Sequence, residues 1–205
     1  MPTRLGLVSD VHATTAPLAA ALALFHDEGV DQVICAGDIA GYGDELEATV
    51  DLLESSGCRA ICGNHDRWHL ARTHGQSGPV DTYLDGLSKT LDLSVEGRRV
   101  HVVHASPPGS LMEGIRLLDE NGDMLVQERQ HWNERLAAFD FDLLIVGHTH
   151  QLFAERLADT LVVNPGSTLF NRSCAIVDLP SLEIRLLPLP GERALRVSSW
   201  RGGWK

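Results

Sequence analysis

The sequence predicts an α/β protein that folds as one domain with mixed β-sheets. Its first sixty-odd residues alternate between short apolar runs and amphipathic stretches. This order of strand and helix is typical of parallel strands joined by right-handed crossovers. From about residue 152 onward, short apolar runs follow one another closely, which favours antiparallel pairing. A chain of 205 residues is long enough to bury roughly 70 per cent of its unfolded surface around one core.

Three apolar runs in the N-terminal part predict buried strands at residues 5–8, 32–36 and 58–62. A helix is expected to begin near Thr15 and to stop at Gly29. Its apolar face is formed by Leu18, Leu22 and Phe25, which recur at helical spacing. The resulting strand–helix–strand–helix–strand order predicts three parallel strands.

The second helix is expected to begin at a capping box. Asp44 is followed three residues later by Glu47, which is the spacing of that motif. Leu46, Val50 and Leu53 then form an apolar stripe. Asp44 is therefore the predicted N-cap of this helix.

The later chain predicts further strands at residues 99–104, 143–146, 161–163, 175–177 and 184–187. A helix between the first two of these is indicated by Leu125, Trp132, Leu136 and Phe139. We expect a single domain over residues 1–187. Residues 188–205 form either an ordered arm or a loose tail, and the sequence leaves both open.

Composition and charge narrow the possible partners. The formal net charge of −11 argues against binding to long nucleic acids, whose protein partners usually carry basic patches. A small anionic substrate stays possible, because two divalent ions would reverse the local charge of a pocket. The apolar run after Met1 stops at Ser9, and no run reaches the roughly 18 residues that a membrane helix needs. We expect a cytoplasmic protein without a membrane partner, of unknown oligomeric state.

Polar side chains follow five of the predicted strands directly. In open α/β sheets, ligands bind outside the carboxyl ends of the strands. Each short motif alone is usually a turn or a helix cap, but their repetition after five strands predicts one shared site. The motifs are Asp10-Val11-His12, Gly37-Asp38, Gly63-Asn64-His65-Asp66, His104 and Gly147-His148-Thr149-His150.

The candidate ligands are nitrogen and oxygen donors without sulfur. They are Asp10, His12, Asp38, Asn64, His104, His148 and His150. Seven ligands exceed what one tetrahedral zinc ion uses, but they suit two ions about 3.5–4 Å apart that share a carboxylate. Imidazole with carboxylate favours divalent transition metals. We expect two such ions, with Mn²⁺ preferred and Fe, Zn, Co or Ni as alternatives.

Together these motifs resemble the calcineurin-like metallophosphoesterase superfamily. Asn164-Pro165-Gly166-Ser167 also matches its compact bacterial and archaeal phosphodiesterase branch, and the motifs span residues 10–167 in family order. The resemblance implies a four-layer α/β/β/α sandwich with two mixed β-sheets. It also implies one ion held by Asp10, His12 and His150, a second held by Asn64, His104 and His148, and Asp38 shared by both.

The implied activity is hydrolysis of a small phosphoester. A hydroxide bridging the two ions would attack phosphorus, and the family's acid histidine falls on His65, which would protonate the leaving oxygen. A phosphodiester is the preferred substrate. A phosphomonoesterase acting on a small metabolite or nucleotide is the first alternative, and a non-catalytic scaffold of the same fold is the second.

One motif departs from many relatives. Three and four residues after the shared aspartate, they carry Asp-Arg, whereas this chain has Gly41 and Tyr42. The missing arginine would grip a phosphate through two parallel hydrogen bonds. Its absence disfavours monoesters, and Arg67 and Arg72 in the loop after Asn64 are the alternatives that could substitute for it. Gly41 and Gly43 are expected to leave room for the second arm of a diester.

Overall fold

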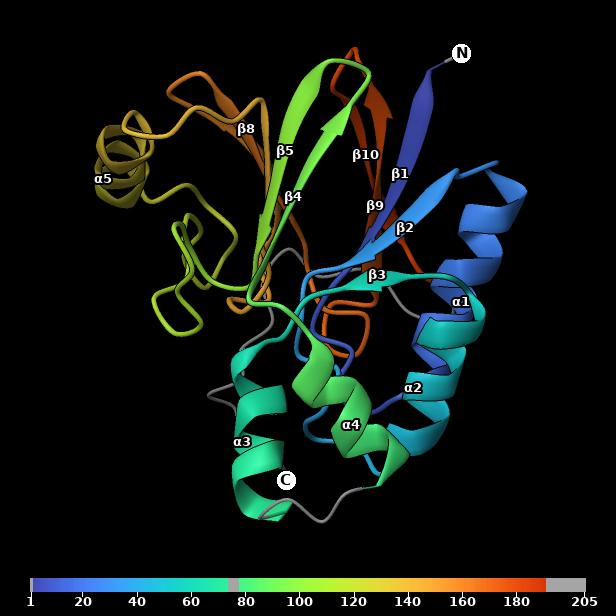
Figure 1. The fold of residues 1–205 in the computed structure, drawn as a ribbon. Helices are drawn as coiled ribbons and strands as arrows, with labels where there is room; N and C mark the ends of the chain where they lie inside the picture. Colours follow the sequence, from blue (N-terminus) through green and yellow to red (C-terminus); the bar gives the residue numbers. More distant parts are fainter. Residues whose placement is uncertain (1, 74–77, 191–205) are drawn as a thin grey trace.

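The computed structural model describes residues 2–73 and 78–190. Within these residues, ten strands form two five-stranded sheets (Figure 1). The first sheet has the order β10-β9-β1-β2-β3, with β1 Thr3–Val8, β2 Gln32–Cys35, β3 Arg59–Ala60, β9 Ser173–Leu179 and β10 Glu183–Pro188. The second has the order β4-β5-β6-β8-β7, with β4 Thr90–Val95, β5 Arg98–Val103, β6 Leu143–Ile145, β7 Leu152–Leu157 and β8 Thr160–Pro165.

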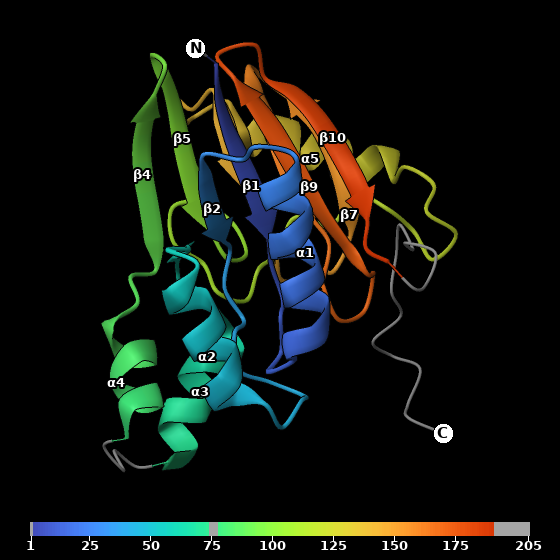
Figure 2. The same ribbon diagram turned by 90° about the vertical axis from the view of Figure 1, so that its right-hand side faces the viewer.

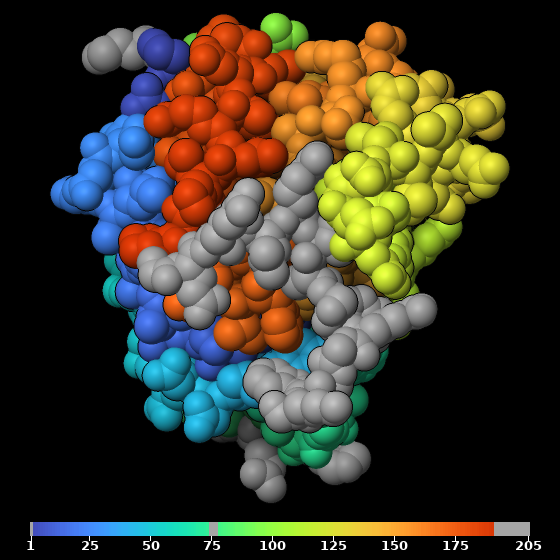
Figure 3. Space-filling view, turned by 180° about the vertical axis from the view of Figure 1, so that it is seen from behind, coloured from blue at the N-terminus to red at the C-terminus, as the bar shows by residue number. Residues whose placement is uncertain are grey.

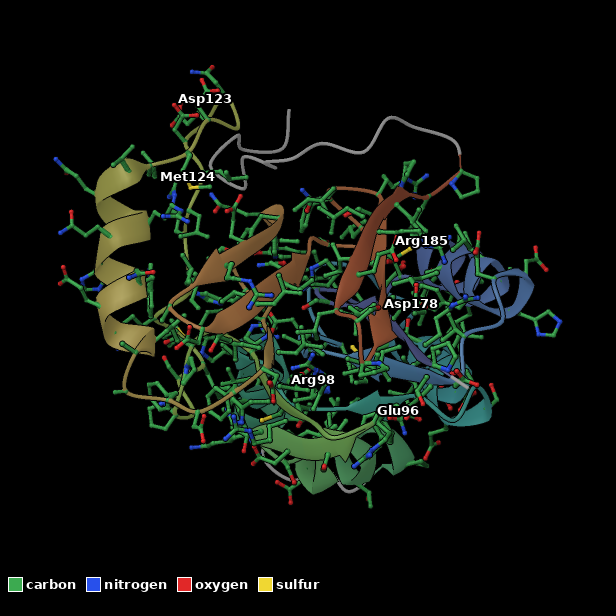
Figure 4. All side chains as sticks on the ribbon, turned by 90° about the horizontal axis from the view of Figure 1, so that it is seen from above. Glu96, Arg98, Asp123, Met124, Asp178 and Arg185 are labelled. Atoms are coloured by element: carbon green, nitrogen blue, oxygen red, sulfur yellow. The ribbon has the colours of Figure 1, made fainter. Side chains whose placement is uncertain are left out.

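The two sheets pack face to face between helices, so the predicted four-layer sandwich is confirmed. Figure 2 shows α1 in front of the first sheet, and Figure 4 shows α5 on the opposite side of the molecule, beyond the second sheet. The helices are α1 Thr15–Asp27, α2 Leu46–Ser55, α3 Asn64–Thr73, α4 Pro79–Gly86 and α5 Val126–Leu136.

Three apolar cores hold these layers together. Leu5 and Leu7 of β1 point into the core between the sheets, where they join residues such as Val100 and Val102. Strand periodicity turns the alternate residues outward. A Cβ on Gly6 would lie 2.7 Å from the ring of Phe25, so α1 approaches β1 at this glycine. Two further cores lie under α1 and α2 and under α5.

Strand directions agree with the sequence patterns. β1, β2 and β3 are parallel, as the predicted crossovers require. β7 pairs antiparallel with β8, and β9 with β10, as their short connections predict. Figure 3 shows these two hairpins side by side on the back of the molecule, and β10 contacts β7.

The predicted capping box at Asp44 is wrong. Helix α2 begins at Leu46 with Glu45 at its N-cap position, and no side chain caps it. Instead, a carboxylate oxygen of Glu45 accepts hydrogen bonds from the backbone N and the Oγ1 of Thr15, both at 3.0 Å. The side chain of Glu45 therefore binds a backbone N–H in the first turn of α1 and none in α2. Sequence spacing alone does not reveal this contact between distant segments.

The elements α4 and β4 are absent from the sequence-based prediction. Both are only partly buried: α4 buries Leu84, and β4 has no fully buried residue. Their apolar periodicity is correspondingly weak. At the C-terminal end, β10 reaches Pro188 and the buried Leu189 donates its backbone N–H to the oxygen of Arg172 at 2.7 Å. The predicted arm or tail otherwise lies outside the described residues from 191 onward.

Candidate metal centre

All seven predicted ligands lie in segments that follow the carboxyl ends of strands, but these strands belong to two sheets. Asp10, Asp38 and Asn64 follow β1, β2 and β3 of the first sheet. His104 and the His148–His150 segment follow β5 and β6, which are parallel neighbours in the second sheet. Because the two sheets bring these ends to the lower part of the molecule as drawn in Figure 1, the ligands meet across the interface between them.

The backbone at this site is held in an unusual conformation. Five of the candidate ligands have a positive φ, a region that costs a residue with a side chain of order 1–3 kcal/mol. They are Asp10 (52°), His12 (52°), Asp38 (56°), His148 (65°) and His150 (51°). Such strain is maintained where the surrounding structure overdetermines a geometry, and here it is concentrated on the residues whose side chains converge.

A first group of ligand atoms surrounds one point. Nε2 of His12 lies 3.1 Å from Nε2 of His150. Oδ1 of Asp10 lies 3.2 Å from Nε2 of His150 and 4.0 Å from Nε2 of His12. Ligand atoms around one ion at bonds of about 2.1 Å are roughly 3.0–3.4 Å apart, so most of these separations fit a shared cation. Nδ1 of His150 is buried and has no hydrogen-bond partner within the described residues.

A second group lies beside the first. Oδ1 of Asn64 is 3.1 Å from His104 Nε2 and 2.9 Å from His148 Nδ1. Nδ1 of His104 contacts the oxygen of Ala36 at 2.7 Å, so it carries a proton, and Nε2 is the ring nitrogen that could bind a metal ion. With its amide reversed, Asn64 would instead donate from nitrogen to both histidines. A cation between the three groups favours the oxygen.

Asp38 lies between the two groups. Its Oδ2 is 3.3 Å from His104 Nε2. Ligand atoms of Asp38 also fall within 4.8 Å of those of His12 and His65 on one side, and of Asp10 and His104 on the other. This central position fits a carboxylate shared by two ions, and the donor set as a whole fits divalent transition metals.

The electrostatics of the cluster suit metal ligation. Burial opposes ionisation of Asp10 and Asp38, but nearby histidines hold the pKa of both carboxyls below the usual value. Burial lowers the pKa of His12 to about 4 and also lowers the pKa of His148. These two imidazoles are therefore neutral at pH 7, which is the form in which histidine binds a metal ion. Burial acts against charge on His104 as well, yet the adjacent Asp38 raises its pKa to about 9, so a metal ion bound here would have to displace the proton on Nε2.

The predicted acid, His65, stands next to the cluster at the start of α3. Its backbone N–H donates to Oδ1 of Asp38 at 2.8 Å. Its ring centroid lies 4.9 Å from that of His12, 4.9 Å from Tyr42 and 4.8 Å from Trp68. Burial lowers its pKa, while Asp38 and Asp10 act in the opposite direction. Ring contacts with Tyr42 and Trp68 thus position the imidazole.

Asp66 supports the ligand loops, a role that the sequence analysis did not assign. Its buried carboxylate accepts hydrogen bonds from the backbone N–H groups of Gly63 and Ala40, both at 2.7 Å, and of Asp38 at 3.1 Å. Burial, followed by the charge of Asp38, raises its pKa to about 6. The three-residue spacing from Gly63 was the available signal, because an acidic side chain at that spacing often caps a helix.

Other supports come from residues far apart in the sequence. Ser9 donates its hydroxyl to Oδ2 of Asp10, and Ser167 donates to the backbone oxygen of Asp10, both at 2.6 Å. Asn164 donates to the oxygen of Gly147 at 2.9 Å. The Asn164–Ser167 motif therefore supports the ligand segments. Phe170 stacks on His150 with centroids 5.0 Å apart and 19° between planes, a contact that no sequence signal indicates.

Two expectations about the segment after Asp38 need correction. Cβ atoms on Gly41 and Gly43 would lie 2.3 Å from Nδ1 of His12 and 2.2 Å from the oxygen of Ala13. These glycines therefore let the segment pack against His12, and they do not open room for a substrate arm. Arg67, proposed as a substitute for the missing arginine, contacts Asp85 at 3.5 Å and the oxygen of Leu87 at 3.2 Å. It is directed toward α4 and its following loop.

The fold and the cluster define an α/β sandwich protein with a candidate metal site at the meeting strand ends of its two sheets. The sequence matches the calcineurin-like phosphoesterase superfamily domain over residues 3–180, and the chain belongs to this family. An uncharacterized protein of Methanocaldococcus jannaschii is 24% identical in an alignment 180 residues long, which covers 79% of this chain and 68% of that protein.

Solved structures share the fold. A metallophosphoesterase from Sphaerobacter thermophilus superposes with a TM-score of 0.70 at 23% identity, over 94% of this chain and 90% of that one. A structure described as a novel archaeal phosphodiesterase gives 0.62 at 20% identity, over 91% and 100%. Vacuolar protein sorting 29 from Cryptosporidium parvum gives 0.55 at 13% identity, over 91% and 96%. No helix among the described residues is long and apolar enough to cross a membrane.

Proposed function

We propose that this protein is a two-metal phosphoesterase that prefers phosphodiesters. The observation that carries the proposal is the convergence of seven nitrogen and oxygen donors into two adjacent groups with Asp38 between them. Asp10, His12 and His150 would hold one ion, and Asn64, His104 and His148 the other. Two divalent ions held in this way supply a water of lowered pKa and neutralise charge on the phosphoryl oxygens.

His65 would supply the proton for the leaving oxygen. Its ring lies beside His12 and Asp38, on the rim of the cluster, and it is only partly buried. An imidazole in this position can reach a phosphoester bound at the ligand cluster without itself being one of the seven ligands. A proton delivered to the leaving oxygen accelerates departure of poor leaving groups by roughly 10²–10⁴-fold.

The preference for diesters rests on a missing cation. A monoester dianion carries one more negative oxygen than a diester, and enzymes commonly bind it with an arginine fork. At the position where relatives carry that arginine, Tyr42 contacts the rings of His12 and His65 instead. Arg67 is engaged with Asp85 and Leu87, away from this position. A diester, with one formal negative charge, needs no further cation.

The metal content provides the first test. After loading with Mn²⁺ and desalting, elemental analysis should find two ions per chain. Asp38→Asn should lower this number most among single ligand changes, because Asp38 is placed between both groups. Asp44→Asn removes an exposed carboxylate six residues later and serves as the matched control. A wild-type stoichiometry of one or less would contradict the two-ion centre.

Substrate preference provides the second test. With Mn²⁺ at fixed pH, kcat/KM for bis-(p-nitrophenyl) phosphate should exceed that for p-nitrophenyl phosphate. A higher value for the monoester would make the protein a phosphomonoesterase, which is the alternative activity. A second alternative is a non-catalytic scaffold, because a vacuolar sorting protein has a similar fold. Two bound ions without turnover of either ester would favour that role, although all seven ligand positions and His65 are filled here.

A further inference from the structure

Two exposed aromatic side chains flank the predicted acid. In the described part of the chain, four large hydrophobic side chains are exposed, and the aromatic ones among them are Tyr42 and Trp68, each 45% exposed. Both contact the ring of His65, with centroid distances of 4.9 and 4.8 Å. Both exposed large aromatic side chains of the described residues therefore lie beside the same predicted catalytic residue.

These rings extend along one side of the ligand cluster. Tyr42 also contacts Phe170, at 5.3 Å between centroids, and Phe170 in turn lies against His12 and His150. Trp68 stands three residues after His65, on the same side of helix α3. We call Tyr42, His65, Trp68 and Phe170 the aromatic rim. It joins the metal ligands at one end and carries the exposed indole of Trp68 at the other.

The position of His65 within the rim indicates which part of a substrate meets it. If His65 protonates the leaving oxygen, the group attached to that oxygen lies next to His65 and therefore against Tyr42 or Trp68. A flat aromatic group can stack on such rings, and stacking of one base on an aromatic side chain contributes enough to change affinity by roughly 5- to 100-fold. An aliphatic leaving arm would leave both rings exposed.

We propose that the substrate is a small diester whose leaving arm carries a nucleobase, and that this base stacks on Trp68 with Tyr42 as its neighbour. The proposal rests on the proposed phosphodiesterase function. A small nucleoside diester agrees with the net charge of −11, which disfavours a long nucleic acid strand. In such a substrate the base provides a surface for stacking, and the single phosphodiester group carries one negative charge to the metal centre.

The kinetic test compares thymidylyl-(3′→5′)-thymidine with two analogues, each lacking the base on one arm. The scissile phosphate and both alcohols are unchanged in these compounds, so their kcat/KM ratios isolate the base. Removing the base from the arm that is released as the nucleoside should lower kcat/KM by roughly 5- to 100-fold. Removing the other base should have a smaller effect. Equal values for all three compounds would overturn the proposal.

Variants connect this dependence to Trp68. In Trp68→Ala the ratio between parent and leaving-arm analogue should approach one, whereas Trp68→Phe should keep most of it. Because the ratio compares substrates with the same leaving oxygen, any effect of the variant on His65 cancels. Val126→Ala, which shortens a side chain 74% exposed at the start of α5, is the matched control and should keep the wild-type ratio. A ratio unchanged by Trp68→Ala would exclude stacking on Trp68.

A binding measurement separates this proposal from the proposed function. Thymidine, which carries no phosphate, is titrated into the protein without added metal while tryptophan fluorescence is recorded. Saturable quenching that Val126→Ala retains and Trp68→Phe loses supports the base site even if no diester is hydrolysed. Metal-dependent hydrolysis without such quenching, and with equal kinetics for the three compounds, would leave the phosphodiesterase standing and remove the base site.

Discussion

The side chains at this site differ in how the surrounding structure holds them. His65 contacts its surroundings through rings, and its backbone rather than its imidazole binds Asp38. Among the candidate ligands, by contrast, His104 is hydrogen-bonded through its ring to the backbone of the other sheet's segment, at the oxygen of Ala36. Changes at His65 should therefore alter chemistry more than metal content.

His65→Gln should keep two metal ions and lose activity in a manner that depends on the leaving group. Turnover should fall by roughly 10²–10⁴-fold for diesters with alkoxide leaving groups, and less for p-nitrophenolate, which leaves without a proton. Elemental analysis alongside both assays is the measurement. Loss of the metals would assign His65 a structural role, and equal losses for both leaving groups would remove the acid assignment.

Asp66→Asn should destabilise the fold although the two side chains have nearly the same shape. The carboxylate accepts three backbone N–H groups, and an amide would turn its NH₂ toward at least one of them. The free energy of unfolding should fall by roughly 1–3 kcal/mol, the cost of leaving a buried donor without a partner. Urea unfolding of the metal-free protein measures it, with Asp44→Asn as control. An unchanged midpoint would contradict the role of Asp66.

At the scale of elements, the N-terminus of α1 depends on a side chain from the segment before α2. The two hydrogen bonds from Thr15 to Glu45 lower the pKa of that carboxyl. A carboxyl whose pKa is lower in the folded state stabilises the fold above its unfolded pKa. This contribution is lost as the pH falls through the folded pKa.

Glu45→Gln should therefore reduce stability at pH 7 and have a vanishing effect at pH values below the folded pKa of Glu45. The mutant still offers a neutral oxygen to Thr15, so the difference reports the charge. Thermal unfolding of both proteins between pH 7 and pH 3 is the measurement. Glu47→Gln, an exposed change on α2, is the control. A difference that stays constant over this pH range would show that ionisation of Glu45 is not responsible.

At the scale of the whole molecule, the candidate ligands join two sheets that otherwise meet through an apolar core. Asp10, Asp38 and Asn64 come from the first sheet, and the histidines after β5 and β6 from the second. Ions held between them would bind the folded state far better than the unfolded chain. Ligand binding of this kind raises stability in proportion to the logarithm of the free ligand concentration.

Mn²⁺ should consequently raise the unfolding temperature. At a free concentration 100 times the dissociation constant, one site contributes about 2.7 kcal/mol. The temperature shift should be reversed by a chelator and should be smaller in Asp38→Asn. Differential scanning calorimetry with and without Mn²⁺ provides the measurement. A wild-type shift that Asp38→Asn fully retains would place the bound metal elsewhere.

Much of the fold and the site could be predicted from local patterns. Apolar runs identified β1, β2, β5 and β6, and polar residues directly after them indicated the ligands, because strand ends have a fixed relation to strand sequence. Partly buried elements such as α4 and β4 escaped prediction, since a weakly buried element has a weak apolar period. The capping residue of α1 escaped because it comes from Glu45, thirty residues away.

The sequence by itself determined which side chains can serve as ligands and that they stand at strand ends. Only the tertiary structure decided that these ends belong to two sheets, that Asp66 binds the backbone of Asp38 and Ala40, and that Tyr42 and Trp68 enclose His65. It also decided that Gly41 packs against His12 instead of opening space. The physical reason is the same in each case. Periodicity records whether a residue is buried, whereas long-range packing determines which residue buries it.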